Sequence, residues 1–210
     1  MILYGHALSS ASYRVRIALN LKGLEVTTVP VHLRRGEQRQ PEFLQLNSQG
    51  FVPALRLDDG EVLTQSMAII EYLEETHPQP RLLPDAPKAR ARVRGLCQLI
   101  ACDVHPLNNL RVLKYLEAQL GLDEHARNAW YRHWIQAGFE ALEQSLTRDV
   151  PSGRFCHGDS PGMADVLLVP QVFNARRFSA DLAPYPRIVA IDQACRELPA
   201  FAAAAPEPQS

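Results

Sequence analysis

Residues 52–76 read VPALRLDDGEVLTQSMAIIEYLEET, and this stretch decides the fold of the N-terminal part of the chain. Two short apolar runs flank Asp58-Asp59-Gly60, a combination typical of a β-hairpin. Ser66 then opens a segment with apolar residues at helical spacing, and Pro78 and Pro80 stop it. We therefore predict two antiparallel strands followed by a helix that Ser66 caps.

The segments before this stretch alternate between strand-like and helix-like patterns. Residues 1–4 and 26–31 are apolar strand candidates, whereas residues 12–22 and 41–46 have helical spacing. The order is then β, α, β, α, β, β, α, in which the first strand-helix-strand needs a right-handed crossover. This is the order of a thioredoxin-like α/β domain, which we expect over residues 1–80.

The chain beyond residue 87 predicts helices almost throughout. We expect a linker at residues 81–87 and then an all-helical domain over residues 88–210. The first helix should run from residue 88 to about residue 119 and break near Pro106, because proline removes a backbone hydrogen bond. Further helices are expected at residues 123–146, 162–173 and 187–194, followed by an alanine- and proline-rich tail from Pro199 onward.

The composition excludes several classes of protein. Of 210 residues, 22 are Lys or Arg and 23 are Asp or Glu, so the net charge of −1 gives no electrostatic reason to expect a nucleic acid or an anionic membrane as partner. Charged residues interrupt every apolar run well before the roughly 18 residues that a membrane span needs. Residues 1–6 carry no secretory signal, so we expect a cytoplasmic protein. The cysteines form no Cys-x-x-Cys pair, and we expect no metal site.

Three polar features fall where elements of the predicted sheet begin or end. Ser9-Ser10-Ala11-Ser12 lies at the first strand–helix junction, where a hydroxyl at a helix N-terminus could stabilise a thiolate or simply cap the helix. Val52-Pro53 opens a strand. With a cis bond the backbone of Val52 could pair with a peptide ligand, whereas a plain edge-strand proline needs no ligand. Gln65-Ser66 offers an amide, a hydroxyl and a helix N-terminus, which suit an α-amino-carboxylate group, although Ser66 alone is an ordinary N-cap.

The run from Ser9 to Leu19, SSASYRVRIAL, resembles the zeta class of glutathione transferases, whose members carry SSCS followed by WRVRIAL. The resemblance continues over nearly the whole chain, through Val52-Pro53, Gln65-Ser66, Leu82-Leu83-Pro84, His105-Pro106-Leu107-Asn108-Asn109, Val169-Pro170-Gln171-Val172, Arg177-Phe178 and Pro184-Tyr185-Pro186. It implies the glutathione transferase fold, in which a thioredoxin-like domain precedes an all-helical domain. It also implies glutathione as the cofactor and a homodimer as the assembly.

The resemblance further implies a glutathione-dependent cis–trans isomerase of a small acidic dioxo substrate, either maleylacetoacetate or maleylpyruvate. In such a reaction a thiolate adds to the cis double bond, the resulting single bond rotates, and expulsion of the thiolate leaves the trans isomer and free glutathione. The enzyme must lower the pKa of the thiol and stabilise an enolate-like charge. Two alternatives stay open: a glutathione transferase or peroxidase that processes α-haloacids or hydroperoxides, and a glutathione-binding protein without catalysis.

Individual residues receive roles from the same resemblance. Ser9 would meet the glutathione sulfur, with Ser10 as a second candidate. Glutathione would be bound by Ser9, Val52, Pro53, Gln65 and Ser66, and from the helical domain by His105 and Asn109. Asn109 and Arg177 would bind the substrate, and Arg177 suits a carboxylate because a planar guanidinium matches it in a bidentate way.

The chain departs from the zeta class at three positions. Leu8 stands where an arginine that helps to bind the acidic substrate is common, and Arg14 or Arg111 could compensate only if it faces the pocket. Ala11 replaces the usual cysteine, which is not the group that activates glutathione. Gly162 replaces a serine or threonine and weakens a helix cap by roughly a few tenths of a kcal/mol.

Overall fold

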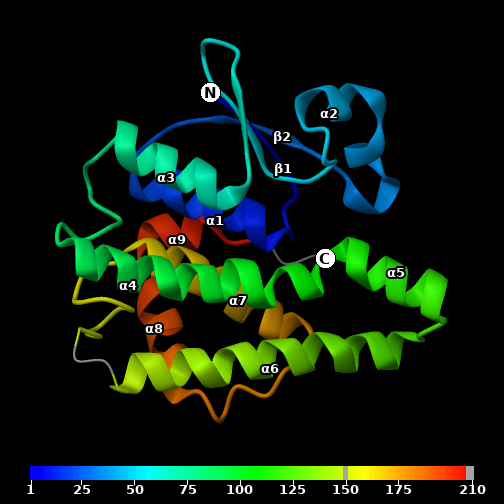
Figure 1. The fold of residues 1–210 in the computed structure, drawn as a ribbon. Coiled ribbons are helices and arrows are strands. Elements are labelled where there is room, and N and C mark those ends of the chain that lie inside the picture. Colours follow the sequence, from blue (N-terminus) through cyan, green and yellow to red (C-terminus); the bar gives the residue numbers. More distant parts are fainter. Residues whose placement is uncertain (149–150, 207–210) are drawn as a thin grey trace. The chain divides into compact units, whose positions relative to one another are not determined.

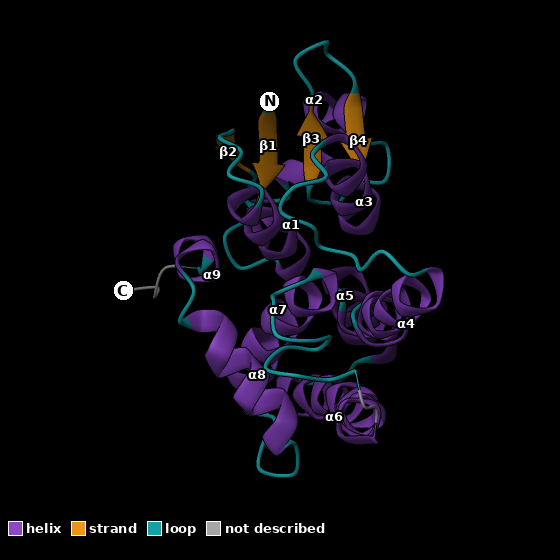
Figure 2. Ribbon diagram, turned by 90° about the vertical axis from the view of Figure 1, so that its left-hand side faces the viewer, coloured by secondary structure: helices purple, strands orange, loops and turns teal. Residues whose placement is uncertain are grey.

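The computed structural model describes residues 1–148 and 151–206, which divide into two compact units (Figure 1). The first comprises Met1–Leu82 together with the segment that begins at Glu197, and the second comprises Leu83–Arg196. The first unit holds the sheet, and the second is built from helices (Figure 2). The structure therefore groups the C-terminal segment with the first unit, whereas the sequence placed it in the helical domain. Within the described residues, no helix is long and apolar enough to cross a membrane.

The sheet of the first unit has the strand order β2-β1-β3-β4. Strand β1 (Ile2–Gly5) pairs in parallel with β2 (Thr27–Pro30) and antiparallel with β3 (Ala54–Arg56). Strand β3 in turn pairs antiparallel with β4 (Val62–Thr64), across the predicted hairpin. The thioredoxin-like order of strands and helices is therefore confirmed.

The helices of the first unit follow the predicted pattern closely. Within residues 1–80 they are α1 (Ser10–Leu21), α2 (Pro41–Leu46) and α3 (Ser66–Thr76), with 3₁₀ turns at Leu33–Arg35 and Glu37–Arg39. Helix α1 packs against α3 and buries Tyr13 and Ile17, whereas Leu21, the next apolar residue at four-residue spacing, is half-buried. It ends before Gly23, whose φ of 65° suits a glycine. The prediction that Ser66 caps α3 is wrong, because Gln65 is the N-cap and Ser66 is already helical.

The C-terminal segment forms a helix, α9 (Pro199–Ala204), that packs against α1. Pro199 lies in the first turn, where a missing N–H is tolerated, and the Phe201 ring is fully buried. The expectation of a tail from Pro199 onward is therefore wrong. Its alanines and prolines suggested a tail, but burial of one aromatic side chain stabilises a short helix.

The second unit is built around the buried helix α7 (Met163–Arg177). It packs against α4 (Pro87–Gln98) and α8 (Pro186–Arg196), and α8 also packs against α6 (Glu124–Arg148). Asp165 accepts hydrogen bonds from the N–H groups of Cys156 (2.9 Å) and Gly162 (2.8 Å) at the start of α7. Because Gly162 has no side chain, only this half of the capping box forms. Helix α7 runs past the predicted end at Phe173, since Asn174 and Ala175 are still buried.

The long helix predicted at residues 88–119 is divided into four parts. Helix α4 is followed by a π-helical turn (Leu99–Val104), a 3₁₀ turn (Pro106–Asn108) and α5 (Leu110–Leu120). The break near Pro106 is confirmed, but the regular helix ends earlier, at Gln98. Helix α6 passes very close to the π-helical turn, because a Cβ added at Gly138 would clash with Val104.

A buried ion pair fixes the C-terminal end of α1 to α3. The Lys22 ammonium lies 2.6 Å from the Glu74 carboxylate, and their side chains are 0% and 6% exposed. Lys22 also donates to the carbonyl of Pro80 (2.7 Å), and Glu74 accepts from the N–H of Leu82 (3.0 Å). The pair therefore holds both helices against residues 80–82.

Replacing Lys22 with methionine is expected to lower the free energy of unfolding by about 3–5 kcal/mol, because the Glu74 carboxylate is left buried without its counter-charge. Urea denaturation measures the difference. The double variant Lys22→Met/Glu74→Gln is the control and should recover most of the loss, since it buries no charge and keeps an acceptor for Leu82. A loss below about 1 kcal/mol in the single variant would contradict the argument.

Candidate active site

The sheet register brings three predicted features to one edge of the first unit. Tyr4 of β1 lies opposite Ala54 of β3, and Ala54 lies opposite Thr64 of β4. The features that leave the sheet at this edge are Ser9 after β1, Val52-Pro53 before β3 and Gln65-Ser66 after β4. Residues that are far apart in the sequence therefore share one edge of the first unit.

Ser9 is the N-cap of α1, with an extended backbone (φ −75°, ψ 117°). Its Oγ accepts a hydrogen bond from the N–H of Ser12 (3.2 Å), which leaves the hydroxyl hydrogen to be donated elsewhere. Ser9 is half-buried, whereas Ser10 is the first helical residue and is only 4% exposed. Ser9 thus caps the helix and can also donate at a helix N-terminus, where the dipole of α1 favours an anion.

Val52 and Pro53 lie directly before β3, and the bond between them is cis. The ladder between β3 and β1 begins at Ala54, so the N–H and C=O of Val52 are outside it. Val52 is half-buried, and Pro53 is buried. The backbone of Val52 is therefore placed to pair with an extended ligand along this edge.

Gln65 and Ser66 form the start of α3. Gln65 has φ 69° and ψ 117°, a conformation that costs a residue with a side chain roughly 1–3 kcal/mol and is characteristic of ligand-binding sites. Its exposed amide donates to Oε1 of Gln49 (2.7 Å). The Oγ of Ser66 accepts from Nη1 of Arg14 (3.4 Å). An anion at this helix N-terminus would meet backbone N–H groups and the amide of Gln65 together.

Arg14 does not replace the arginine that is absent at position 8. It is 1% exposed, and its guanidinium reaches from α1 to Ser66 of α3. Arg14 therefore contributes a contact within the first unit. Arg111, the other candidate, is exposed at the second residue of α5.

His105 and Asn109 lie on either side of the 3₁₀ turn Pro106–Asn108 in the second unit. Asn109 is the N-cap of α5, and its Oδ1 accepts from the N–H of Arg111 (3.1 Å). That bond leaves the amide NH₂ group of Asn109 to donate to another molecule. Both His105 and Asn109 are half-buried.

Helix α6 holds this turn in place. The indole N–H of Trp130 donates to the carbonyl of Leu107 (2.9 Å), and the amide of Asn108 donates to the carbonyl of Tyr131 (3.1 Å). The ring of Tyr131 then stacks on Phe178, with 3.6 Å between ring centroids. Two neighbouring residues of α6 thus connect the turn with the end of α7. Sequence reasoning missed them, because aromatic residues within a helix usually indicate packing alone.

Arg177 is the last residue of α7 and is exposed. Its guanidinium lies over the ring of Phe178, at 5.4 Å from the centroid. The neighbouring Arg176 pairs with the buried carboxylate of Asp192 (2.6 Å), but no carboxylate of the described residues lies in ion-pair contact with Arg177. Arg177 is therefore the arginine of the two that can receive a carboxylate ligand.

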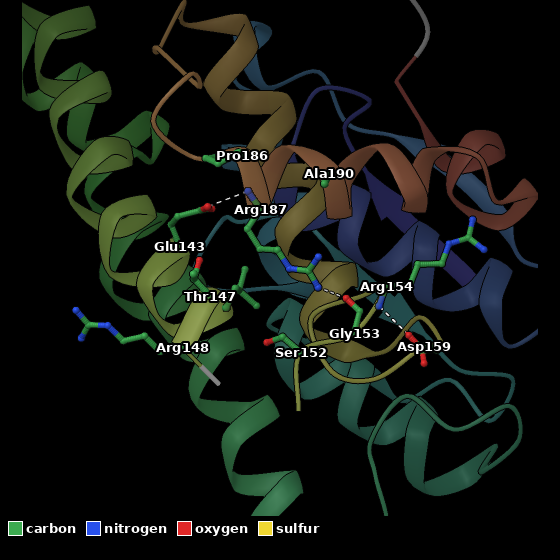
Figure 3. Close-up of a pocket in the computed structure, with 11 residues that line it drawn as sticks. Glu143, Thr147, Arg148, Ser152, Gly153, Arg154, Asp159, Pro186, Arg187 and Ala190 are labelled. Carbon is green, nitrogen blue, oxygen red and sulfur yellow. Dashed lines mark hydrogen bonds between the residues drawn. The ribbon is translucent and has the colours of Figure 1, made fainter. Parts of the chain in front are cut away.

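An open cavity of about 900 Å³ in the second unit holds none of the predicted site residues (Figure 3). The two Glu143 oxygens accept from the N–H groups of Arg187 (2.8 Å) and Ile188 (2.9 Å) and so occupy the N-terminus of α8. The Arg187 side chain donates to the carbonyl of Gly153, and Arg148 and Arg154 extend to opposite sides. Glu143 and Arg187 therefore bind backbone groups of the second unit itself.

Two buried thiols of the second unit, those of Cys156 and Cys195, are poor nucleophiles. Burial raises the pKa of Cys156 and of Cys195, and the nearby carboxylate of Asp165 raises both further. These thiols therefore stay protonated at neutral pH. Among the described residues, no cluster of His, Cys, Asp and Glu could hold a metal ion.

Known proteins match the chain over its full length. A probable maleylacetoacetate isomerase from Vibrio cholerae serotype O1 is 51% identical, over 100% of this chain and 97% of its own. A solved maleyl pyruvate isomerase, described as a bacterial glutathione S-transferase of the zeta class, has a TM-score of 0.97 at 51% identity, over 100% of both chains. The chain belongs to the zeta class of glutathione transferases. The model of the glutathione S-transferase N-terminal domain matches residues 8–76 of this transferase, a range that contains Ser9, Val52-Pro53 and Gln65-Ser66.

A further relative of this transferase has been solved with ligands. It is a maleylacetoacetate isomerase from Anaeromyxobacter dehalogenans 2CP-1, 42% identical, over 99% of this chain. One structure holds glutathione (TM-score 0.88, 95% of that chain), and another holds dicarboxyethyl glutathione and citrate in the active site (TM-score 0.87, 91% of that chain). The zeta-class resemblance and the glutathione transferase fold inferred from the sequence are both confirmed.

Proposed function

We propose that this zeta-class transferase is a glutathione-dependent cis–trans isomerase of a maleyl-type dioxo acid, such as maleylacetoacetate or maleylpyruvate. The proposal rests on the single sheet edge where the Ser9 hydroxyl, the backbone of Val52 and the Gln65-Ser66 pair emerge. A tripeptide thiol fits this edge, because it offers one sulfur, one extended backbone and one α-amino-carboxylate group. The names of the relatives support the choice of substrate.

The cysteinyl and γ-glutamyl parts of glutathione have matching groups in the first unit. Val52 would pair with the cysteinyl backbone like an added strand, beside Pro53. The N-terminus of α3, with Ser66 and the amide of Gln65, would hold the γ-glutamyl carboxylate, since N–H groups and the helix dipole favour an anion. His105 and Asn109 are the groups that we expect to reach glutathione from the second unit.

When bound, glutathione supplies a thiolate that adds reversibly to the cis double bond and leaves after the bond has rotated. Ser9 would donate its hydroxyl hydrogen to the sulfur, and the N-terminal dipole of α1 would lower the pKa of the thiol further. The free NH₂ group of Asn109 would donate to the carbonyl oxygen on which enolate-like charge develops. No proton has to be taken from carbon at any point, and the proton of the thiol leaves to solvent when the thiol ionises.

Arg177 would hold a carboxylate of the substrate. Its planar guanidinium suits bidentate contact, and the adjacent Phe178 ring restrains the side chain from one side. Because Tyr131 stacks on Phe178 and Asn108 bonds to Tyr131, the carboxylate site and the Asn109 site share one support. We propose that this support fixes the distance between the two groups.

We further propose a homodimer in the cytoplasm, as the zeta-class resemblance implies. Sedimentation of the purified protein tests the assembly, since a dimer has twice the 23.5 kDa mass of one chain. A single species at the mass of one chain contradicts the dimer.

An absorbance assay with each of the two maleyl substrates tests the function. We expect turnover of at least one substrate with glutathione, and none with S-methylglutathione, which offers the same peptide contacts but no thiol. Absence of glutathione-dependent turnover with both substrates overturns the proposed function.

One observation favours a second candidate, a glutathione transferase that processes α-haloacids. Leu8 places an aliphatic, half-buried side chain directly before Ser9, where zeta-class enzymes commonly have an arginine. The buried Arg14 does not supply the missing charge. The site of this chain is therefore less cationic, and a substrate with one carboxylate would lose less binding energy than one with two.

Replacing Leu8 with arginine is expected to raise kcat/KM for the maleyl substrate by about tenfold, because one added charge-assisted hydrogen bond contributes about 1.5–3 kcal/mol. Steady-state kinetics of Leu8→Arg and of the neutral control Leu8→Gln measure the effect. The gain should appear in KM and be absent from the control. An unchanged KM in Leu8→Arg would show that Leu8 lies away from the substrate.

A further inference from the structure

One face of α1 carries a row of polar side chains that no proposed contact with glutathione uses. Ser12, Arg16 and Asn20 are spaced by four residues and therefore lie on the same side of the helix. The Oγ of Ser12 accepts from the N–H of His6 (3.3 Å), and Nη2 of Arg16 donates to the carbonyl of Ala7 (3.0 Å). The first two members of the row thus hold the backbone of the loop between β1 and α1.

This loop is the segment that presents Ser9. It is closed by a hydrogen bond from the N–H of Ser9 to the carbonyl of His6 (3.0 Å). With His6 held by Ser12 and Ala7 held by Arg16, the residues before Ser9 have fixed positions relative to the N-terminus of α1. The direction in which the Ser9 hydroxyl points therefore depends on these contacts.

The same row continues to the C-terminal helix α9. Nε of Arg16 donates to the carbonyl of Ala204 (3.0 Å), and the amide of Asn20 donates to the carbonyl of Ala200 (2.9 Å). Ala204 is the last residue of α9, where carbonyl groups have no partner within the helix and carry partial negative charge. Arg16 is the one member of the row whose side chain contacts both the loop and α9, and its planar fork allows two N–H groups to serve two carbonyls.

We propose that Arg16 is a positioning residue that holds the loop carrying Ser9 against the C-terminal end of α9 and thereby supports thiol activation. The inference rests on the proposed role of Ser9 at the glutathione sulfur. Without Arg16, the carbonyl of Ala7 loses its hydrogen-bond donor. The loop can then move relative to the N-terminus of α1. Small displacements of a donor at a reacting atom have large effects on rate.

The test compares Arg16→Met, which keeps an unbranched side chain but removes the guanidinium that lies over the Tyr13 ring, with Arg16→Lys and Asn20→Ala. Asn20→Ala is the matched control, because it removes a bond to α9 and leaves the loop untouched. The ultraviolet absorbance of bound thiolate gives the pKa of the glutathione thiol in each complex, and calorimetry gives the glutathione Kd. We expect Arg16→Met to lower the thiolate fraction at neutral pH and kcat by about tenfold, Arg16→Lys to fall between, and Asn20→Ala to match the wild type.

The KM for the dioxo substrate should stay unchanged in all three variants, because the residues proposed to bind the substrate lie elsewhere. A wild-type thiol pKa in folded Arg16→Met overturns the inference. An equal loss of thiolate fraction in Asn20→Ala overturns it as well, because that loss would come from weaker packing of α9 and not from the contact between Arg16 and the loop. If Arg16→Met does not fold, the thiol pKa of Arg16→Lys decides in the same way. A wild-type protein that binds and ionises glutathione but isomerises nothing refutes the proposed function, while the thiol pKa still tests Arg16.

Discussion

The Ser9→Ala variant is expected to lose about 10²–10³-fold in kcat/KM, because it removes a preorganised donor from an atom on which negative charge develops. The pKa of the bound glutathione thiol should rise in the variant, and the thiolate fraction at neutral pH should fall with it. The Kd of glutathione should change little, since the backbone of Val52 and the N-terminus of α3 are untouched. Steady-state kinetics and ultraviolet titration of the bound thiol measure both effects.

Two controls separate catalysis from folding in this experiment. Ser9 is also the N-cap of α1, so Ser9→Ala should lose about 1 kcal/mol of stability, which circular dichroism during urea denaturation reports. Ser9→Thr keeps both the hydroxyl and the cap and should retain most of the activity. Ser10→Ala removes the hydroxyl of the second candidate, which is 4% exposed. This variant should change kcat/KM and the thiol pKa little. A larger loss in Ser10→Ala than in Ser9→Ala would contradict the assignment.

The Arg177→Met variant is expected to raise the KM for the dioxo substrate by about 10- to 100-fold, because charge-assisted hydrogen bonds contribute about 1.5–3 kcal/mol. The KM for glutathione should be unchanged. Arg177→Lys should fall between the wild type and Arg177→Met, since an ammonium keeps the charge but cannot make a bidentate contact.

Arg176 provides the matched control for this second experiment. It precedes Arg177, has the same side chain and is also solvent-accessible, but it pairs with the buried Asp192. Arg176→Met should therefore lower stability and leave the substrate KM near the wild-type value. An equal rise in KM for the two variants would show a general effect of positive charge at the end of α7 rather than a specific carboxylate site.

Local patterns in the sequence were sufficient to predict the strands and helices of residues 1–80. The turn at Asp58-Asp59-Gly60 and the four-residue spacing in α1 each depend on neighbours within a few positions, and the order of strands and helices along the chain followed from such patterns. Two features could not be predicted this way. Helix α9 depends on a surface of α1 that lies 180 residues earlier, and the π-helical turn before Pro106 depends on the close approach of Gly138 from α6.

The candidate site was likewise predictable only where it depends on local sequence. The three polar features at element ends were visible in the sequence, because strand–helix junctions are local and the register then gathers them at one edge. The surroundings of the site were not visible. The burial of Arg14 and the link from Asn108 through Tyr131 to Phe178 join residues that are distant in the sequence. The roles of the individual site residues, and the domain limits at 1–80 and 88–210, stay predictions.

The central claim is that glutathione acts as a catalyst at this site and is not consumed. Nuclear magnetic resonance of a reaction with a large molar excess of maleyl substrate over glutathione tests it directly, because substrate, product and glutathione are observed together. We predict complete conversion to the trans isomer, many turnovers per glutathione and full recovery of free glutathione. Conversion that stops when glutathione is used up, with a stable thioether as product, would contradict the account and favour a transferase.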